Sequence, residues 1–305
     1  MDALHKAGHE KHMFTLAHLS DIHLAPLPAP RMGELPGKRV TGYINWLRKR
    51  RFAHDRATLD ALIADLKAQA PDHIALTGDI ANIALEAEFV RGRRWLQQLD
   101  SFKNVSFVPG NHDAYVRQAV RYASQWTPYM TGDDGTVGFP YVRRRGPLAL
   151  IGLSTAVSTA PFMATGRLGR AQIDALAPLL DALKAEGLFR VILIHHPPIS
   201  GAKPHKRLTD AAGLMKVIAS HGAELLLHGH DHVHMLNWLH GPNGTRVPAV
   251  GVPSASAAPG LSRDDAAYNL YAIDGKPGAW RCEMMSRGVG ADGEITERRR
   301  MNLTL

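Results

Sequence analysis

Cysteine is almost absent from this chain. The 305 residues include a single cysteine, Cys282, so no disulfide can form within the chain. Such a composition is typical of proteins in a reducing compartment and unlike small secreted domains held together by disulfides. We expect Cys282 to be a half-buried residue of a strand at residues 280–285 and not a reactive thiol.

Long apolar runs are also absent. The longest uncharged stretch, residues 146–166, contains two prolines and five serines or threonines. A membrane-spanning helix needs about 20 mostly apolar residues, so this stretch predicts a strand and a loop. Residues 1–12 lack the apolar core of a secretory signal and predict a flexible polar tail. We therefore expect a cytoplasmic protein. A peripheral position at the inner membrane face is an alternative within this prediction.

No linker rich in Pro, Gly or Ser divides the chain, and no internal repeat is visible. Apolar strand-like runs alternate with segments of helical periodicity, which predicts a single α/β domain over residues 13–305. Strands are expected at residues 14–19, 74–76, 105–108, 148–153, 191–194, 225–227, 247–252, 268–273 and 280–285. Helices are expected at residues 53–69, 86–99, 170–184 and 214–220. The close spacing of the last strands indicates that part of the sheet structure is antiparallel.

Five short polar motifs each follow one of these strand-like runs. They are Asp21-Ile22-His23, Gly78-Asp79, Gly110-Asn111-His112-Asp113, His195-His196-Pro197-Pro198 and Gly229-His230-Asp231-His232. Open α/β sheets bind ligands beyond the carboxyl ends of their strands. Five strands that end in such residues would therefore direct them to one place.

The residue types in these motifs are those that divalent transition metals prefer, namely imidazole nitrogens and carboxylate oxygens. Asp21 and His23 are two residues apart at a strand end, where the alternation of side chains points both to one side. Asp79 has two oxygens and can bridge two ions. The set of seven candidate ligands is completed by Asn111, His195, His230 and His232.

Two ions about 3.5–4 Å apart can clamp the attacking and leaving oxygens of a phosphoryl transfer. A water molecule between them, with its pKa lowered from 15.7 toward about 7, is the natural nucleophile. We therefore predict a hydrolase with two divalent transition metal ions. Because sites of this composition accept Mn, Fe, Zn or Co, the identity of the metals stays open.

In this order, the motifs resemble the signature of the calcineurin-like metallophosphoesterase superfamily, which reads Asp-x-His, Gly-Asp, Gly-Asn-His-Asp/Glu, His and Gly-His-x-His. The resemblance spans residues 14 to about 232 and implies a four-layer αββα sandwich of two mixed β-sheets flanked by helices. It implies that one metal is held by Asp21, His23, Asp79 and His232, and the other by Asp79, Asn111, His195 and His230.

The same resemblance implies roles for residues outside the ligand set. His112 is similar to the catalytic histidine of the family, which carries no metal and faces the leaving-group oxygen. Asp113 is expected to orient His112 through a hydrogen bond. His196 is expected to support the ligands from outside, and His228 and His234 are expected to be strand-end or surface residues.

Two of the motifs, the one at Gly78-Asp79 and the one at His195–Pro198, indicate which branch of the superfamily this chain resembles. Protein serine/threonine phosphatases of this superfamily carry Gly-Asp-x-Val-Asp-Arg-Gly, and the phosphate-gripping arginine of that motif is missing after Gly78-Asp79. DNA-repair nucleases of the superfamily usually lack His-Pro-Pro. The run of residues 71–79, together with His195-His196-Pro197-Pro198, is most similar to bacterial members that resemble cyclic nucleotide phosphodiesterases.

Charge is the second informative feature, because the chain has a net charge of +8. Residues 31–56 form a basic insertion with eight basic and two acidic residues, a local charge of +6. Within it Val40, Tyr43, Ile44 and Leu47 recur at helical spacing, with Trp46 beside them. Residues 38–52 could thus form a packed surface helix, a contact with an anionic membrane or lipid substrate, or a nucleic-acid patch with residues 143–145 and 298–300.

These features predict an enzyme that hydrolyses a phosphodiester, cyclic-nucleotide-like or related, by attack of a metal-activated hydroxide. The alternative enzyme is a peripheral-membrane pyrophosphatase that acts on a lipid-linked nucleotide such as UDP-diacylglucosamine, which the pattern Lys-Arg…Gly…Asn…Arg-Arg in the insertion also resembles. Nucleic acid is the less favoured partner, and the oligomeric state stays open. The alternative that is not an enzyme is an inactive binding scaffold stabilised by metal ions.

Overall fold

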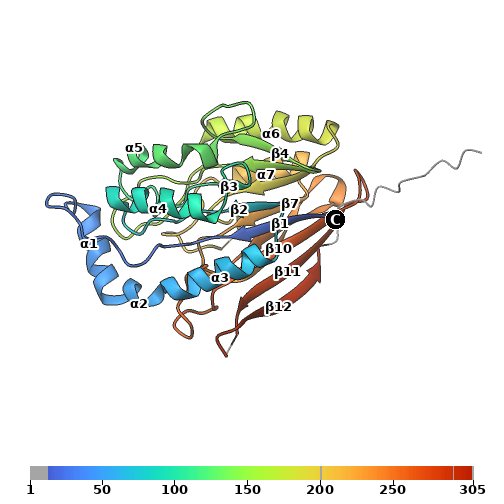
Figure 1. Ribbon diagram of the computed structural model, residues 1–305. Coiled ribbons are helices and arrows are strands. Elements are labelled where there is room, and N and C mark those ends of the chain that lie inside the picture. The colour runs from blue at the N-terminus through green and yellow to red at the C-terminus, as the bar shows by residue number, and fades with distance from the viewer. Residues whose placement is uncertain (1–12, 200, 291, 304–305) are drawn as a thin grey trace, which may run out of the picture.

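The computed structural model describes residues 13–199, 201–290 and 292–303. Within this part of the chain, two mixed sheets of six strands each form the centre of the molecule (Figure 1). The strand orders are β12-β11-β10-β1-β2-β3 and β4-β5-β6-β7-β9-β8. The tail that we predict over residues 1–12 lies outside the described residues.

The strands of the first sheet are β1 (Phe14–Leu19), β2 (His73–Leu76), β3 (Val105–Phe107), β10 (Ala267–Asp274), β11 (Arg281–Val289) and β12 (Ile295–Asn302). Those of the second are β4 (Tyr141–Arg145), β5 (Leu148–Gly152), β6 (Phe189–Leu193), β7 (Leu225–His228), β8 (Met235–His240) and β9 (Arg246–Gly251). Strands β1 to β3 are parallel, as are β5, β6, β7 and β9. The remaining pairs, β1–β10, β10–β11, β11–β12, β4–β5 and β8–β9, are antiparallel.

Helices cover the outer faces of the two sheets (Figure 1). The longer ones are α1 (Lys38–Asn45), α3 (Arg56–Ala68), α4 (Glu86–Leu99), α6 (Arg170–Ala185) and α7 (Ala211–His221). Shorter turns are η1 (Trp46–Arg50), α2 (Arg51–Ala53), α5 (Ala119–Ala123), η2 (Ser124–Met130) and η3 (Pro242–Gly244). In the part of the chain that the structure describes, no helix is both long and apolar enough to cross a membrane.

The core explains this layering. Along β5 and β6, Leu150 and Val191 face the cluster shared with the first sheet, whereas Ile151 and Ile192 face a second cluster beneath α6 and α7. Successive side chains of a strand point to opposite faces, so a continuous apolar strand needs a cover on both sides. The predicted α/β fold, two mixed sheets flanked by helices, is confirmed.

The strands that the sequence did not predict share one property. Strands β4, β8 and β12 all lie at sheet edges, and β4 and β12 are rich in arginine. Edge strands often carry charged side chains, which hide the apolar alternation of a strand. Cys282 lies in a strand as predicted, but in β11 it is buried and not half-buried, and burial raises the pKa of its thiol to about 12.

Candidate metal centre

The five motifs lie where the parallel strands of the two sheets end. Asp21 and His23 follow β1, Asp79 follows β2, and residues 111–113 follow β3. From the second sheet, His195 and His196 follow β6, while His230 and His232 follow β7. The structure therefore brings together all seven residues that the sequence predicts as metal ligands, and contacts among their side chains join the two sheets.

The backbone at these strand ends is unusual, because five of the seven residues have a positive φ. These are Asp21 (53°), His23 (39°), Asp79 (57°), His230 (73°) and His232 (55°). Non-glycine residues adopt this left-handed region at a cost, and such positions cluster at functional sites. Asp21 and His23 lie on the same side because of this local turn, held by bonds from their N–H groups to Gly78 and Asp79 carbonyls, and not because of strand alternation.

Asp21, His23 and His232 form the first group of donor atoms. Oδ1 of Asp21 lies 3.1 Å from Nε2 of His232 and 3.9 Å from Nε2 of His23. The two Nε2 atoms of His23 and His232 are 3.4 Å apart. Donor atoms this close together can share one ion, and the three residues are among the sets in this protein that could hold one.

Asn111, His195 and His230 form the second group beside Asp79. Oδ1 of Asn111 lies 3.2 Å from Nε2 of His195 and 2.9 Å from Nδ1 of His230. Oδ2 of Asp79 lies 3.3 Å from Nε2 of His195 and 3.9 Å from Nε2 of His23. Asp79 thus faces both groups, which is the position that a bridging carboxylate needs.

Backbone carbonyls orient the imidazole rings of the candidate ligands. Nδ1 of His195 donates to the carbonyl of Thr77 (2.6 Å), Nδ1 of His23 to that of Ala81 (3.1 Å), and Nε2 of His230 to that of Lys206 (2.9 Å). A carbonyl only accepts hydrogen bonds, so these nitrogens carry the protons. In the neutral ring the other nitrogen then has a free lone pair directed at the donor groups, as in many metal sites.

Charge is tightly coupled inside the cluster. Burial alone would raise the pKa of Asp79, but the imidazoles of His195 and His112 outweigh it and hold the pKa at about 2. Burial alone would lower the pKa of His195, yet the Asp79 carboxylate raises it to about 10. The carboxylate of Asp79 thus favours a proton on His195, and a metal ion bound there would take the place of that proton.

His112 is held by contacts on several sides. Its backbone N–H donates to Oδ1 of Asp79 (2.7 Å), its Nδ1 donates to the carbonyl of Asn82, and its ring stacks on Tyr115 with 5.6 Å between centroids. Nε2 is left as the nitrogen that can face a substrate. His112 also lies within ligand-sharing distance of His23 and Asp79.

Asp113 does not orient His112 as the resemblance implied. Its carboxylate accepts hydrogen bonds from the N–H groups of Asp79 (2.8 Å), Ala81 (2.9 Å) and Gly110 (2.9 Å). It therefore ties the loop after β2 to the loop after β3, while the carbonyl of Asn82 orients His112. Asp113 therefore stabilises the backbone conformation of the loop that carries Asp79.

The remaining histidines near the cluster support it. His196 contacts Oγ1 of Thr155 (2.7 Å), donates to the carbonyl of Ala164 (3.1 Å) and packs its ring on His230, with 4.2 Å between centroids. His228 is buried at the end of β7, and His234 is only partly exposed. These positions agree with the supporting and strand-end roles expected from the sequence.

Two residues of the cluster were not singled out in the sequence. Arg50 places Nη1 2.7 Å from Nε2 of His112 and Nη2 3.0 Å from Nε2 of His23. The ring of His54 lies 4.4 Å from that of His23, and its Nδ1 contacts Oγ of Ser256 (2.9 Å). Both belong to the basic insertion of residues 31–56, in which no sequence pattern distinguishes these two residues from their neighbours.

The insertion is fixed to the loops that carry the cluster. Arg39 is buried and donates to the carbonyls of Ile83 and Ala84, next to the carbonyl that orients His112. Gly42 lies so close to Tyr115 and Ile83 that a Cβ atom there would clash with both side chains. The insertion thus borders the candidate metal centre, at the end of the molecule that carries α1 and α2 (Figure 1).

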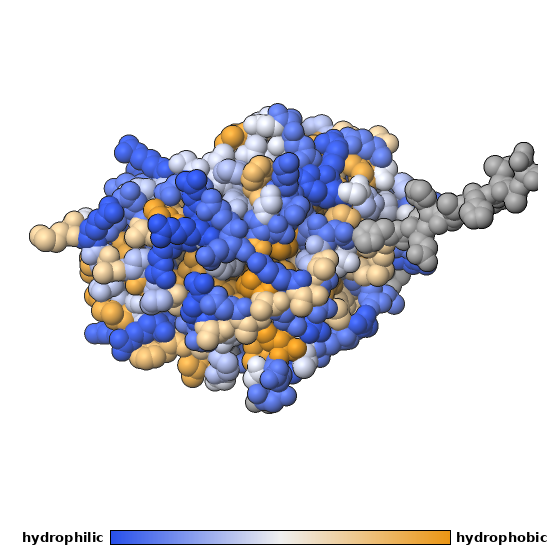
Figure 2. Space-filling model, viewed as in Figure 1, coloured by the Kyte–Doolittle hydropathy of each residue, from blue (hydrophilic) through white to orange (hydrophobic). Residues whose placement is uncertain are grey.

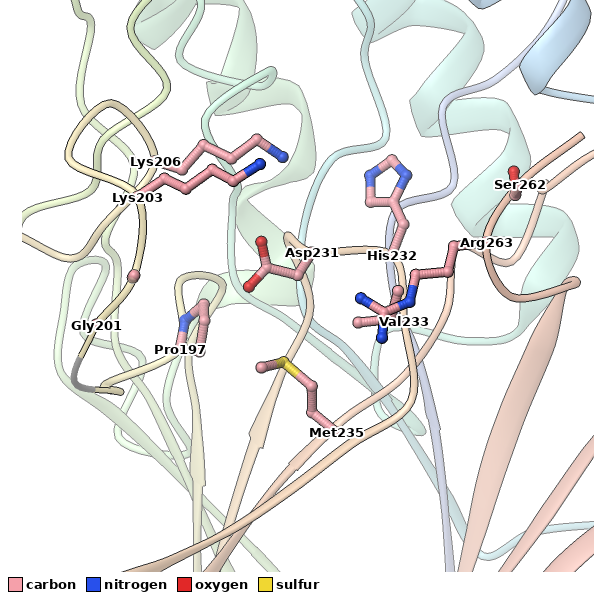
Figure 3. A pocket seen from close by; sticks show the side chains of 11 residues that line it. Pro197, Gly201, Lys203, Lys206, Asp231, His232, Val233, Met235, Ser262 and Arg263 are labelled. Carbon is pink, nitrogen blue, oxygen red and sulfur yellow. The ribbon is translucent and has the colours of Figure 1, made fainter.

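A pocket of about 600 Å³ opens beside His232. Figure 3 shows Lys203 and Lys206 reaching side by side across it, with Asp231 and Arg263 nearer to His232. Among the described residues, the side chains of the two lysines and of Arg263 form no ion pair. A group that enters this pocket next to the cluster would therefore meet three positive charges and one negative charge.

Comparisons with known proteins agree with this geometry. The model of the calcineurin-like phosphoesterase family matches residues 14–234. A probable cyclic nucleotide phosphodiesterase from Synechococcus is 29% identical over 176 residues, which cover 56% of this chain and 62% of that protein. The chain thus matches less than two thirds of the length of this relative.

Solved structures show the same fold at low sequence identity. A dimetal phosphatase from Danio rerio has a TM-score of 0.63 and 14% identity, and the match covers 96% of this chain and 99% of that one. The purple acid phosphatase PPD1 from yellow lupin seeds has a TM-score of 0.57 and 12% identity, over 95% of this chain and 54% of that one. Since the family model covers most of the chain and every motif of the site, the chain belongs to the calcineurin-like phosphoesterase family.

Proposed function

We propose that the chain is a phosphoric ester hydrolase with two divalent metal ions. The proposed ligands are Asp21, His23, Asp79 and His232 for one ion, and Asp79, Asn111, His195 and His230 for the other. The observation that carries the proposal is the position of Asp79, whose Oδ2 lies 3.3 Å from His195 on one side and 3.9 Å from His23 on the other. This set of imidazole, carboxylate and amide donors suits Mn, Fe or Zn.

A buried oxygen of Asp21 supports the fit of a metal. Oδ1 of Asp21 is buried and accepts no well-directed hydrogen bond from the described residues; its nearest neighbour is Nε2 of His232, at 3.1 Å. Leaving a carboxylate oxygen in this state is costly unless a cation compensates it. The Nε2 atoms of His23 and His232, which are 3.4 Å apart and lie beside this oxygen, would complete the coordination.

The proposed reaction divides the work between metals and side chains. When bound, the two ions would neutralise phosphoryl charge and lower the pKa of a water molecule. Nε2 of His112 is proposed to protonate the leaving oxygen, while the Asn82 carbonyl holds the ring in place. Burial and Arg50 lower the pKa of His112 to about 3, and a phosphoryl anion beside the ring would oppose this lowering.

The substrate class that we propose first is a phosphodiester, cyclic-nucleotide-like or related. The similarity to a probable cyclic nucleotide phosphodiesterase over 176 residues supports it. The test is a substrate panel measured after chelation and after adding Mn back: bis(p-nitrophenyl) phosphate, p-nitrophenyl phosphate, and 2′,3′- and 3′,5′-cyclic nucleotides. Metal-dependent hydrolysis of a diester is expected, whereas no hydrolysis of any ester by the metal-loaded protein would favour an inactive binding scaffold.

The second candidate is a peripheral-membrane pyrophosphatase for a lipid-linked nucleotide. The apolar stripe of the insertion faces outward, since Val40, Ile44 and Leu47 are 42%, 43% and 42% exposed. The exposed cations of the same surface are Arg48, Lys49 and Arg51. The end of the molecule with α1 and α2 indeed mixes hydrophobic and hydrophilic surface (Figure 2), as a contact with anionic lipid requires.

Nucleic acid remains the less favoured partner. Arg143 is buried and donates to the carbonyls of Thr131 and Val105, so it stabilises the fold. Arg144 and Arg300 are paired with carboxylates of Glu186, Glu283 and Glu297. The basic runs outside the insertion therefore offer few free charges to a phosphate backbone.

Partition onto vesicles separates the two enzyme candidates. The metal-loaded protein would be sedimented with vesicles of phosphatidylglycerol and phosphatidylcholine at physiological salt. Binding that grows with the fraction of anionic lipid supports the lipid-linked substrate, and no binding supports a soluble diester. A cytoplasmic location, at the membrane face or away from it, stays a prediction in either case.

A further inference from the structure

Arg50 reaches the candidate metal centre because of an irregular turn. After α1 the chain forms the π-helical turn η1, Trp46–Arg50, in which hydrogen bonds join residues five apart. Such a turn changes the direction in which the following side chains point, and π turns are frequent at functional sites. Trp46 is buried at the start of the turn, and Arg50 at its end points to the cluster while its neighbours are exposed.

The guanidinium of Arg50 lies over the imidazole rings and not along their lone pairs. Nη2 is 3.1 Å from Nδ1 and 3.0 Å from Nε2 of His23, and Nη1 is 3.1 Å and 2.7 Å from the same atoms of His112. Similar distances to both nitrogens of a ring mean that the amine sits above its face. The lone pair of each Nε2 is thus left free. A further contact, from Nη2 to Nε2 of His54, is 3.4 Å long, so the N–H groups of Arg50 keep donor capacity.

No carboxylate neutralises this cation. Among the described residues, Arg50 forms no salt bridge, and Asp79 and Asp21 act on it only at longer range. An arginine keeps its charge in proteins, and a partly enclosed charge without a partner is unfavourable. The complement of such a group, placed beside a site for two metals, is an anion with several oxygens.

We propose that Arg50 binds the phosphoryl group of the substrate. Its guanidinium donates hydrogen bonds to a non-bridging oxygen of the phosphomonoester or phosphodiester that lies at the metal centre, and it stabilises the charge that develops there during hydrolysis. This inference rests on the proposed function, but its binding test does not require turnover.

The first test measures binding of inorganic phosphate. Metal-loaded wild type, Arg50→Ala and Arg50→Lys would be titrated by calorimetry, with metal content measured by mass spectrometry. Arg94→Ala is the matched control, because Arg94 is an exposed arginine inside α4. Arg50→Ala should bind phosphate about 10- to 100-fold more weakly at unchanged metal content, and the control should bind it as wild type does.

The second test asks whether Arg50 contacts the phosphoryl oxygens. For Arg50→Ala, kcat/KM for aryl phosphodiesters should fall about 10²–10³-fold, by the same factor for good and poor leaving groups. Guanidinium at tens of millimolar should restore part of the lost rate in Arg50→Ala and leave Arg94→Ala unchanged. Arg50→Lys should retain part of the activity, because it keeps the charge but not the planar fork.

Two results would overturn the inference. One is phosphate binding by Arg50→Ala that equals that of Arg94→Ala. The other is a loss of metal that accompanies the loss of phosphate affinity, because Arg50 would then only support His23. If the wild type hydrolyses no ester but Arg50→Ala still loses phosphate affinity at full metal content, the proposed function fails while the role of Arg50 in anion binding stands.

Discussion

Oδ2 of Asp79 lies 3.3 Å from Nε2 of His195, so a residue that follows β2 of one sheet is paired with a residue that follows β6 of the other. Asp79→Asn keeps the shape of the side chain and removes the negative charge. We expect metal affinity to fall by at least about 10²-fold, more than the loss of a residue that only supports a ligand, and activity to fall with it. Mass spectrometry of the metal-loaded variant measures the first effect and diester hydrolysis the second.

The control for this variant is Asp174→Asn, which removes an exposed carboxylate on α6. It should keep the metal content and activity of the wild type. An Asp79→Asn protein that retains two metals per chain at wild-type affinity would show that Asp79 does not bridge.

His112→Ala tests the proposed general acid. Because His112 is not a proposed ligand, the variant should keep both metals, although the ring lies within ligand-sharing distance of His23 and Asp79. A lost general acid typically costs about 10²–10⁴ in rate. The loss should be smallest for nitrophenyl esters, whose leaving groups need little protonation, and loss of one metal would instead make His112 a ligand.

The outward face of the insertion predicts binding to anionic lipid. Replacing the exposed cations Arg48, Lys49 and Arg51 by glutamine should weaken partition onto phosphatidylglycerol vesicles by about 1 kcal/mol per charge. Hydrolysis of small soluble diesters should be unchanged. Arg50 is left in place, because its contacts with His112 and His23 assign it to the site.

A matched variant removes three exposed cations at the opposite ends of the strands: Lys103 before β3, Arg246 at the start of β9 and Lys276 after β10. It has the same net charge as the first variant. Equal loss of vesicle binding in the two variants would mean that net charge, and not the surface of the insertion, attracts the membrane.

Asp65 joins α3 to the first sheet and predicts a pH dependence of stability. Its carboxylate accepts hydrogen bonds from Arg287 (2.7 Å to each oxygen) and from the hydroxyl of Tyr268 (2.6 Å). Burial alone would raise the pKa of Asp65, but these bonds outweigh it and hold the pKa below the ordinary 3.8. The stabilisation is therefore complete above about pH 5 and is lost as the pH falls through the lowered pKa.

Asp65→Asn should accordingly lower the free energy of unfolding at pH 7 by about 1.5–3 kcal/mol, the usual contribution of hydrogen bonds to charged groups. Urea unfolding of wild type and variant at pH 7 and pH 3 measures the difference. It should shrink at pH 3, and a difference that stays constant would rule out the ionised carboxylate as its source.

Much of the fold could be predicted because its central strands are apolar on both faces. Helix α4 was predicted with the bounds Glu86–Leu99 that the structure shows, and β1 with the bounds Phe14–Leu19. Strands β4 and β12 could not be predicted, because their arginines pair with acidic residues or backbone carbonyls of other segments. Such partners are far away in the sequence and leave no local pattern.

That the seven candidate ligands come together could be predicted, because each one lies within four residues of the end of a strand. The contacts of Asp113 and Arg50 could not. Asp113 bonds to three backbone N–H groups from two loops, and Arg50 depends on a π turn that alters the helical phase after Trp46. A regular helical period over residues 38–52 assumes that every residue turns the helix by the same angle, so it gives the wrong direction for side chains after the π turn.

The central claim is that one pair of metal ions is held between the two sheets and drives hydrolysis of a phosphoester. The most direct test titrates the chelated protein with Mn, counts bound ions by native mass spectrometry and follows hydrolysis of bis(p-nitrophenyl) phosphate in the same samples. We expect hydrolysis to be absent without metal and to rise with the species that carries two ions per chain. Hydrolysis that is undiminished in the metal-free protein, or maximal with one ion bound, would contradict the account.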